Sequence, residues 1–315
     1  MSGQAGTAIL FPGQGAQFAG MGHDWCEAFP TARAVFERAD EWLGFSLSDA
    51  CWNRGDEVNR TDVAQPGILA TSAAVIEVLR EQGLDTTATP LVAGLSLGEY
   101  TALWCAGALS LEDALRLVRL RGEAMQAASE ATPSSMTSLI GADEEQAAAL
   151  AAVGREHGIC AVANLNAPGQ IVLSGELAAL DAVEAVAREH GVKRAVRLTV
   201  AGGFHSECMR PAAERLAAAL AEVEIRTPDI PVVSNVTARP VADADEIRAN
   251  LAGQVCSPVL WEKSMRLAVE RGVTSFLEPA PGMVLAGLMR RIDRSARVHG
   301  CAEPSELAGA LEAVG

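Results

Sequence analysis

The stretch Leu91-Val92-Ala93-Gly94-Leu95-Ser96-Leu97-Gly98-Glu99-Tyr100 joins a short apolar run, the pattern Gly-x-Ser-x-Gly and an Ala- and Leu-rich segment that continues to Gly107. This order predicts a strand, a sharp turn with a serine at its apex, and a helix. The two glycines allow the strand and the helix to approach closely, because neither carries a side chain. Such a turn lifts the hydroxyl of Ser96 into a cleft and leaves the backbone N–H of Leu97 free to stabilise an oxyanion. On its own, the pentapeptide is equally typical of a turn without chemistry.

Length and charge limit the classes of protein to consider. The chain has 315 residues and a formal net charge of −15. The length suits one large domain or two unequal ones, and the charge argues against nucleic acid or an anionic membrane as the main partner. We see neither a signal-peptide pattern nor an apolar run near the ~20 residues of a membrane span, so we expect a cytoplasmic protein. The seven scattered cysteines contain no CxxC pair and predict small buried side chains rather than a zinc site.

Strand and helix patterns alternate along most of the chain and predict an α/β fold with a mostly parallel sheet covered on both faces. A strand at Thr7–Phe11 and a long helix at Asp62–Gln82, with Pro66 in its first turn, precede the serine turn. Residues 132–199 instead show the order strand, helix, strand, strand, helix, strand, which is typical of a ferredoxin-like subdomain. We therefore predict one large catalytic domain from residues 1–131 and 200–315, with a subdomain inserted at 132–199.

A serine hydroxyl needs a base within hydrogen-bond distance to act as a nucleophile at neutral pH. His205 is the best-placed histidine, because it lies in the loop 201–206 where the chain returns from the inserted subdomain to the main sheet. The other histidines fall at predicted helix ends, in a polar loop or on the last predicted strand: His157, His190, His23 and His299. No acidic residue occupies a convincing third position, so we expect a Ser96–His205 dyad whose imidazole is oriented by a neutral acceptor.

A series of segments covering nearly the whole chain resembles the malonyl-CoA:acyl-carrier-protein transacylases and the related acyltransferase domains of polyketide synthases. The matching segments are Phe11–Gln17, Gly94–Tyr100, Arg121–Gln126, Asn164–Gln170 with Ser174-Gly175, Gly203–Ser206, Gln254–Trp261 and Glu278–Leu288. Each motif is weak alone, whereas the ordered set is specific. The resemblance implies an α/β-hydrolase-like large domain with a ferredoxin-like insert. It also implies ping-pong transfer of a malonyl group from malonyl-CoA, through a seryl-acyl enzyme, to the phosphopantetheine thiol of an acyl carrier protein.

The resemblance assigns the chemical steps to particular residues. Ser96 would be the nucleophile, and His205 the general base and then the general acid. Backbone N–H groups of Gln14 and Leu97 would form the oxyanion hole, and the main-chain carbonyl of Gln254 would orient the His205 ring.

Other matching positions are implied to bind the substrate. Arg121 would pair with the free carboxylate of the malonyl group, for which a guanidinium fork is suited. Phe204 and Asn164 would line the site. The chain departs from the family pattern at Leu95, where a histidine usually precedes the nucleophile, and at Gly203, where Ala or Pro is usual. We expect Leu95 to make the pocket wall more apolar and to bear on acyl preference.

The implied partners are malonyl-CoA and an acyl carrier protein, with no resident cofactor or metal, no nucleic acid and no membrane; we expect a monomer. Because carrier proteins are acidic and this chain is too, docking would need a local basic patch. The candidates are Lys193, Arg194 and Arg197, and Arg290, Arg291 and Arg294. The alternatives are a trans-acting polyketide-pathway acyltransferase for another acyl group, a proofreading acyl-carrier hydrolase, and a non-catalytic carrier-binding protein. Arg121 argues against the hydrolase, because uncharged chains give a buried cation no partner.

Overall fold

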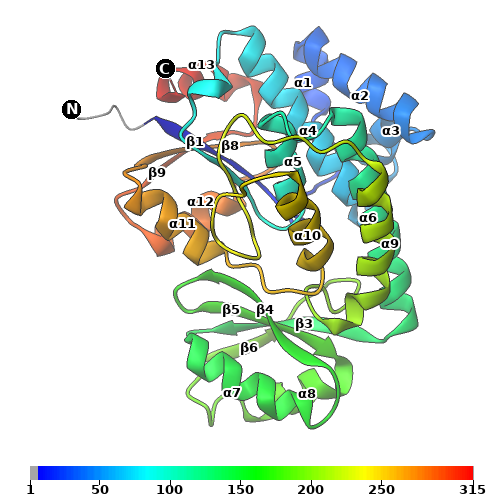
Figure 1. The fold of residues 1–315 in the computed structure, drawn as a ribbon, viewed down its shortest axis with the longest axis vertical. Helices are drawn as coiled ribbons and strands as arrows, with labels where there is room; N and C mark the ends of the chain where they lie inside the picture. The colour runs from blue at the N-terminus through cyan, green and yellow to red at the C-terminus, as the bar shows by residue number, and fades with distance from the viewer. Residues whose placement is uncertain (1–5, 315) are drawn as a thin grey trace.

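The computed structural model describes residues 6–314, and these contain two separate β-sheets (Figure 1). The larger sheet is parallel throughout, in the order β7-β2-β1-β8-β9, and the smaller is antiparallel, in the order β4-β5-β3-β6. The larger sheet consists of β1 (Thr7–Phe11), β2 (Val92–Gly94), β7 (Val232–Val233), β8 (Ser275–Pro279) and β9 (Arg297–Cys301). The smaller consists of β3 (Ser134–Ile140), β4 (Cys160–Ala167), β5 (Gln170–Glu176) and β6 (Arg194–Arg197). The predicted α/β class is confirmed.

The parallel sheet is covered on both faces, because successive side chains of each strand point to opposite sides. Along β1, Ile9 and Phe11 join one apolar core, whereas Ala8 and Leu10 join another. The second core is closed by α11 (Trp261–Glu270) and α12 (Val284–Ile292). The first is closed by α1 (His23–Ala28), α2 (Pro30–Leu43), α3 (Leu47–Trp52), α4 (Thr61–Glu81), α5 (Gly98–Cys105), α6 (Leu111–Ala131), α9 (Arg210–Glu222), α10 (Ala244–Gln254) and α13 (Leu307–Val314).

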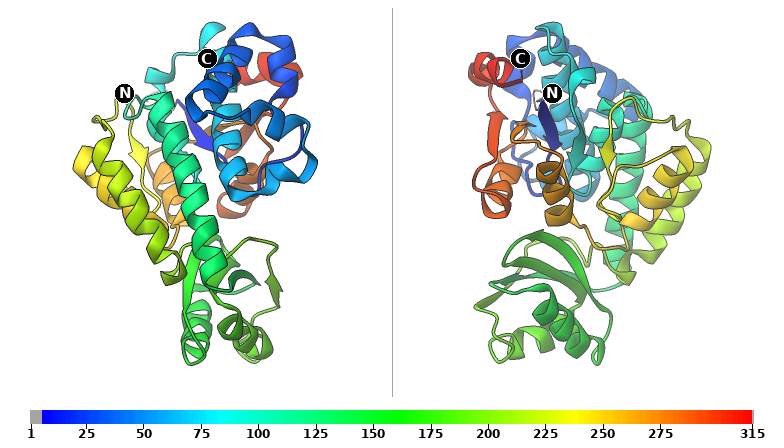
Figure 2. Two further views of the ribbon diagram at one scale, coloured as in Figure 1. Left: turned by 90° about the vertical axis from the view of Figure 1, so that its right-hand side faces the viewer. Right: turned by 60° about the vertical axis from the view of Figure 1, so that its left-hand side comes forward.

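The smaller sheet has the predicted ferredoxin-like connectivity and a core of its own. Its helices α7 (Glu144–Arg155) and α8 (Leu177–Val186) bury Leu150 and Leu180 with Leu139 and Leu173 of the sheet. The long helix α6 leads from the larger part of the molecule into β3 (Figure 2). All four strands fall within residues 132–199; the division into domains at those residues stays a prediction.

Four helices lie outside the ranges for which the sequence predicts helices: α3, α9, α10 and α13. The predicted ranges are 24–29, 31–42, 62–82, 99–107, 111–128, 143–155, 176–190, 261–272 and 283–292. Of the four additional helices, α9 carries a clear signal, because Ala212, Ala213, Leu216 and Leu220 recur at helical spacing and are all buried. α3 spans only six residues, too few for a periodic pattern to stand out.

The position of Pro66 differs from the prediction. It is the sixth residue of α4 rather than part of the first turn. A proline there cannot donate to the carbonyl of Asp62. Arg119 of α6 supplies the missing donor, with Nη1 at 2.7 Å from that carbonyl oxygen and 3.0 Å from the Asp62 carboxylate. The proline is therefore accommodated through a contact between two helices that are distant in sequence.

α4 is the one helix within residues 6–314 that is long and apolar enough to cross a membrane by length and composition alone. The sequence-based expectation that no segment reaches this threshold is therefore wrong. However, 94% of the qualifying window is buried inside the protein. α4 is thus a central core helix, packed against α2, α3, α5 and α6.

The turn between β2 and α5 leaves no room for side chains at either glycine of Gly-x-Ser-x-Gly. A Cβ at Gly94 would overlap the backbone of Gly98, and a Cβ at Gly98 would overlap the carbonyl of Phe11 on β1. Both contacts involve main-chain atoms, which cannot move aside as a flexible side chain can. The pattern therefore follows from backbone packing.

We expect Gly98→Ala to lower the free energy of unfolding by about 1–3 kcal/mol, the range for overpacking a close-packed site. Gly287→Ala is the matched control, because Gly287 is an exposed residue of α12 with open space around its Cβ position. There we expect a gain of about 0.5–1 kcal/mol from helix propensity. Denaturant unfolding of both variants measures the difference. Equal effects would contradict the steric explanation.

Candidate active site

Ser96 lies at the carboxyl edge of the parallel sheet, in a strained turn. Its φ is +53°, which is uncommon for a residue with a side chain. Asn235, just after the neighbouring strand β7, holds this conformation: its Oδ1 accepts from the Ser96 N–H at 2.6 Å, and its Nδ2 donates to the Gly94 carbonyl at 2.7 Å. Such strain costs about 1–3 kcal/mol and persists only where the surroundings determine it.

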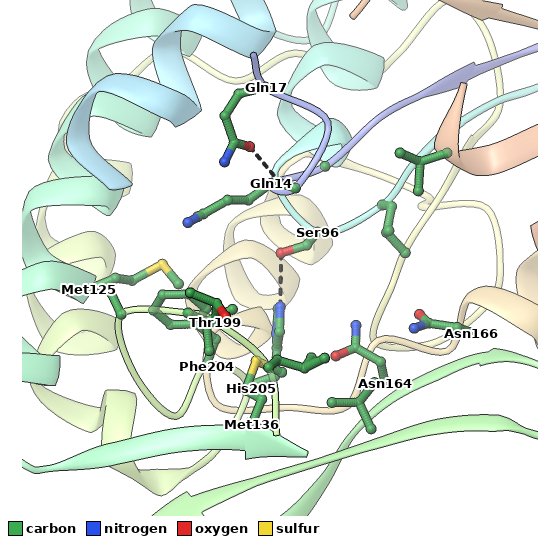
Figure 3. Close-up of a pocket in the computed structure, with 18 of the residues that line it drawn as sticks. Gln14, Gln17, Ser96, Met125, Met136, Asn164, Asn166, Thr199, Phe204 and His205 are labelled. Atoms are coloured by element: carbon green, nitrogen blue, oxygen red, sulfur yellow. Dashed lines mark hydrogen bonds between the residues drawn. The ribbon is translucent and has the colours of Figure 1, made fainter. Parts of the chain in front are cut away.

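Ser96 and His205 come together although 109 residues separate them. Ser96 Oγ lies 2.9 Å from His205 Nε2 (Figure 3). His205 Nδ1 lies 2.8 Å from the main-chain oxygen of Gln254, which can only accept. The proton of a neutral imidazole therefore sits on Nδ1, and Nε2 is left to accept from the serine hydroxyl. His205 also has a positive φ, +59°.

The environment of His205 favours the neutral imidazole. The pKa of His205 is lowered from 6.5 to about 4: burial is the largest cause, and the nearby positive charge of Arg121 acts in the same direction, while hydrogen bonds with the backbone of Gln254 and Ser257 oppose them. At neutral pH the ring is therefore unprotonated. Only in that form can it take the proton of a serine hydroxyl.

Arg121 projects from α6 into the site and is 1% exposed. Nη2 donates to Ser96 Oγ and to Gln254 Oε1, both at 2.9 Å, and Nη1 donates to Gln65 Oε1 at 2.8 Å. These three acceptors are all neutral groups. Within the described part of the chain, the buried Nε of Arg121 has no hydrogen-bond partner. Burial lowers the pKa of Arg121, with Tyr100 and Glu99 opposing the shift. The guanidinium is thus a buried cation without a directly bonded carboxylate.

Arg119, two residues earlier on α6, contrasts with Arg121. It lies near the surface, where it pairs with Asp62 and Glu123. This agrees with the helical geometry, which turns the two side chains to different faces.

Sequence reasoning missed four parts of this arrangement: Gln65, Glu99, Asn235 and the side chain of Gln254. Glu99 is 2% exposed, and its Oε2 accepts from Gln254 Nε2 at 2.6 Å and from the Asn235 N–H at 3.3 Å. Asn235 had a usable signal, because it ends the stretch 231–235, whose apolar residues predict a strand, and the carboxyl ends of parallel strands meet at one edge of a sheet. Gln65 and the Gln254 side chain have none, since only tertiary packing brings their helices to the serine.

A cavity of about 790 Å³ opens beside Ser96 and His205 (Figure 3). Of the predicted substrate-binding residues, Arg121, Asn164, Phe204 and Leu95 all line it. The opposite wall comes from the smaller sheet, through Met136 on β3, Val172 on β5 and Leu198, with Met125 of α6 beside them. The cavity therefore lies between the two sheets and combines a polar end with an apolar one.

The predicted oxyanion-hole groups lie at the same edge. Gln14 follows β1 and lines the cavity, and Leu97 directly follows Ser96 and precedes α5. Across residues 6–314, neither backbone N–H donates to a protein acceptor. Both are thus available to a ligand, and their role stays a prediction.

Residues 6–314 contain no group of three or more His, Cys, Asp or Glu side chains that could hold a metal ion. The described cysteines are all free, and six of the seven are buried. Their predicted role as small core side chains is confirmed.

The fold and this geometry together define a class: α/β-hydrolase-like proteins that use a serine in acyl transfer. Comparison with known proteins narrows the class. The model of the acyl transferase domain family matches residues 9–308. The chain belongs to this family, and within it to the malonyl-CoA:acyl-carrier-protein transacylases.

Two kinds of relative support the assignment. A malonyl CoA-acyl carrier protein transacylase of Bacillus subtilis (strain 168) is 41% identical over 97% of this chain and 96% of its own length. The solved structure of an acyl-carrier-protein S-malonyltransferase from Bartonella henselae has a TM-score of 0.94 at 41% identity and covers 98% of this chain and 99% of its own. A malonyl-transacylase solved in complex with its type II polyketide synthase acyl-carrier protein has a TM-score of 0.91 at 37% identity, with 98% and 99% coverage.

We expect the imidazole of His205 to titrate with a midpoint near pH 4 rather than near 6.5, because burial and Arg121 both disfavour the cation. The ring-proton shifts of labelled histidine, followed by NMR against pH and assigned with His205→Asn, measure this. Arg121→Ala should move the midpoint upward, because one of the two causes is then removed. A wild-type midpoint at or above 6.5 would show that the site does not keep this histidine neutral.

Proposed function

We propose that this protein transfers a malonyl group from malonyl-CoA to the phosphopantetheine thiol of an acyl carrier protein. The observation that carries the substrate assignment is Arg121, a buried guanidinium bonded to Ser96 Oγ and otherwise to neutral oxygens. Leaving a charge buried and unpaired costs several kcal/mol, so such a site favours an acyl group that brings its own carboxylate. The activity named for the relatives is the same.

The first half-reaction acylates the serine. His205 Nε2 takes the proton of Ser96 as Oγ attacks the thioester carbonyl carbon, and the N–H groups of Gln14 and Leu97 stabilise the oxyanion. The C–S bond then breaks, and His205 returns its proton to the CoA thiolate. Throughout, the Gln254 carbonyl holds Nδ1–H and stabilises the transient imidazolium.

The second half-reaction uses the same groups in the opposite order. The phosphopantetheine thiol gives its proton to His205, its sulfur attacks the seryl ester, and Ser96 leaves with the proton. We propose that no metal or resident cofactor takes part, because the partner carries the prosthetic group and the side chains supply the acid–base chemistry. Since both half-reactions use soluble substrates, we place the reaction in the cytoplasm.

A hydrolase that clears uncharged acyl groups is less well supported, because Arg121 would then stay without an anion. The chemistry serves fatty-acid or polyketide synthesis equally. A trans-acting polyketide acyltransferase for an uncharged acyl group would use the same dyad but would not need Arg121.

Carrier docking is proposed beside the turn that precedes β5, at the rim of the cavity. Arg291 on α12 donates to Gln170 Oε1 at 3.0 Å, and Gln170 lines the cavity. Lys193 lies against Gly141, whose N–H bonds the carbonyl of Gly169. One member of each basic group, Arg291 and Lys193, therefore lies near this turn. Arg197 no longer belongs among the candidates, because Asp181 and Glu184 neutralise it, each at 2.7 Å.

Ser96→Ala should abolish the malonyl adduct that forms when wild-type protein is mixed with malonyl-CoA, because no other hydroxyl lies at the turn. Intact-mass measurement detects the adduct, and circular dichroism checks the fold. Release of CoA without an adduct in the wild type would favour hydrolysis. An adduct that persists in the variant would place the nucleophile elsewhere.

Arg121→Ala should cost about 2–5 kcal/mol in kcat/KM for malonyl-CoA, the range for truncating one partner of a buried charge pair. Transfer from acetyl-CoA should be unchanged or faster, because the desolvated cation has gone. The comparison needs kcat/KM for both thioesters in both proteins. An equal fall for the two would make Arg121 a packing residue. A wild type that prefers acetyl groups would overturn the malonyl assignment but not the acyltransferase one.

Charge reversal at Arg290 or Lys193 should raise the KM for the carrier protein several-fold at low salt and leave the KM for malonyl-CoA unchanged. The effect should fade as salt rises. Arg297→Glu is the matched control, because Arg297 is exposed at the amino end of β9, the opposite edge of the sheet from Ser96. Equal effects at Arg290 and Arg297 would count against docking at the rim.

A further inference from the structure

Glu99 is a buried carboxyl that the proposed mechanism does not use. It lies in the first turn of α5, three residues after the nucleophile, and is 2% exposed. Its Oε2 accepts from Gln254 Nε2 and from the backbone N–H of Asn235. A buried carboxyl is costly to keep, so its contacts need an explanation.

The side-chain amide of Gln254 connects Glu99 to the arginine. Nε2 donates to Glu99 Oε2 at 2.6 Å and to the Ser96 carbonyl at 3.0 Å, while Oε1 accepts from Arg121 Nη2 at 2.9 Å. Of the two ways to place the amide oxygen and nitrogen of Gln254, only one turns the NH₂ group to the two acceptors and the oxygen to the Arg121 donor. The bond to Glu99 is the shortest of the three.

Glu99 can act as an anchor because its own position does not depend on Arg121. The backbone of Asn235 and the side chain of Ser234, both just after β7, bond its carboxyl. Gln254, in contrast, lies at the end of α10 and reaches the site through its side chain. The hydrogen bond to Glu99 therefore holds the side-chain amide of Gln254 in place relative to α5 and the end of β7, at the edge of the parallel sheet.

The hydrogen bond from Gln254 Nε2 depends on the length of the Glu99 side chain and not on its charge. Burial raises the pKa of Glu99 to about 7, although hydrogen bonds from Gln254, Asn235 and Ser234 lower it. The protonated and ionised forms both keep an oxygen that can accept from Gln254 Nε2. An amide of the same length would do the same.

We infer that Glu99 is a positioning residue: by fixing the amide of Gln254, it aims the guanidinium of Arg121 and sets how strongly the site prefers an acyl group with a carboxylate. This inference rests on the proposed malonyl transfer. It assigns Glu99 no contact with the reacting atoms. Its effect should therefore appear in the choice between acyl groups and not in acyl transfer as such.

Two conservative variants separate reach from charge. Glu99→Gln keeps the length and an acceptor oxygen but loses the charge. Glu99→Asp keeps the charge but withdraws the oxygens by about 1.5 Å, one C–C bond. The measurement is the ratio of kcat/KM for malonyl-CoA to that for acetyl-CoA. We expect Glu99→Gln to keep the wild-type ratio and Glu99→Asp to lower it about 10-fold or more, the scale of a lost hydrogen bond to a charged group.

Glu278→Asp is the matched control for shortening a buried carboxyl. Glu278 is 0% exposed, and it accepts the N–H groups of Leu285 and Ala286 at 2.8 Å at the start of α12. Burial likewise raises the pKa of Glu278 to about 7. We expect Glu278→Asp to lower stability and leave the malonyl-to-acetyl ratio unchanged.

The remaining outcomes overturn the inference. If the malonyl-to-acetyl ratio of Glu99→Asp equals that of the wild type, or is no lower than that of Glu99→Gln, then the length of the Glu99 side chain does not set the preference through Gln254. If Glu278→Asp lowers the ratio as much as Glu99→Asp, the effect is general destabilisation. The proposed malonyl transfer fails separately, when the wild type does not prefer malonyl-CoA to acetyl-CoA. If Arg121→Ala leaves that preference intact, Arg121 is a packing residue and the inference about Glu99 falls with it.

Discussion

The turn that carries Ser96 is the constraint on which the rest of the site depends. The backbone of Gly98 packs against the carbonyl of Phe11, so α5 must begin directly over β1. In this tight turn Ser96 has a positive φ, and Asn235, just after β7, stabilises that conformation through both ends of its amide. Three neighbouring parallel strands thus contribute to one turn, which points the hydroxyl at the cavity and frees the N–H of Leu97.

A single buried cation has two effects in this site. Arg121 is close enough to lower the pKa of His205, which keeps the proposed base unprotonated at neutral pH. It also offers a charge to an incoming carboxylate, and its present partners are neutral oxygens that do not satisfy that charge. Because Arg121 and His205 are both buried, these effects are stronger than they would be at the surface. The negative charge of a bound anionic acyl group would partly cancel the lowering of the His205 pKa by Arg121, making His205 a stronger base once substrate is bound.

Much of the fold follows from patterns that the sequence carries locally. The alternation of strands and helices, the ferredoxin-like order at 132–199 and the Gly-x-Ser-x-Gly turn each occupy a continuous stretch, and each appears in the structure. Two predictions that failed, those for Pro66 and Arg197, depended on partners from elsewhere in the chain. Pro66 is tolerated within α4 because Arg119 supplies the lost donor. Arg197 contributes no free charge because α8 brings Asp181 and Glu184 to it.

The sequence by itself determined the elbow, the class of fold and, through an ordered set of motifs, the family and its candidate residues. These depend on backbone conformation and residue spacing, which neighbouring residues decide. Only the tertiary structure decided that His205 is neutral, that Arg121 faces neutral acceptors, and that Glu99, Asn235 and Gln254 form one network with Ser96. The reason is physical: pKa values and hydrogen-bond partners depend on burial and on groups up to 158 residues apart, which no local pattern records.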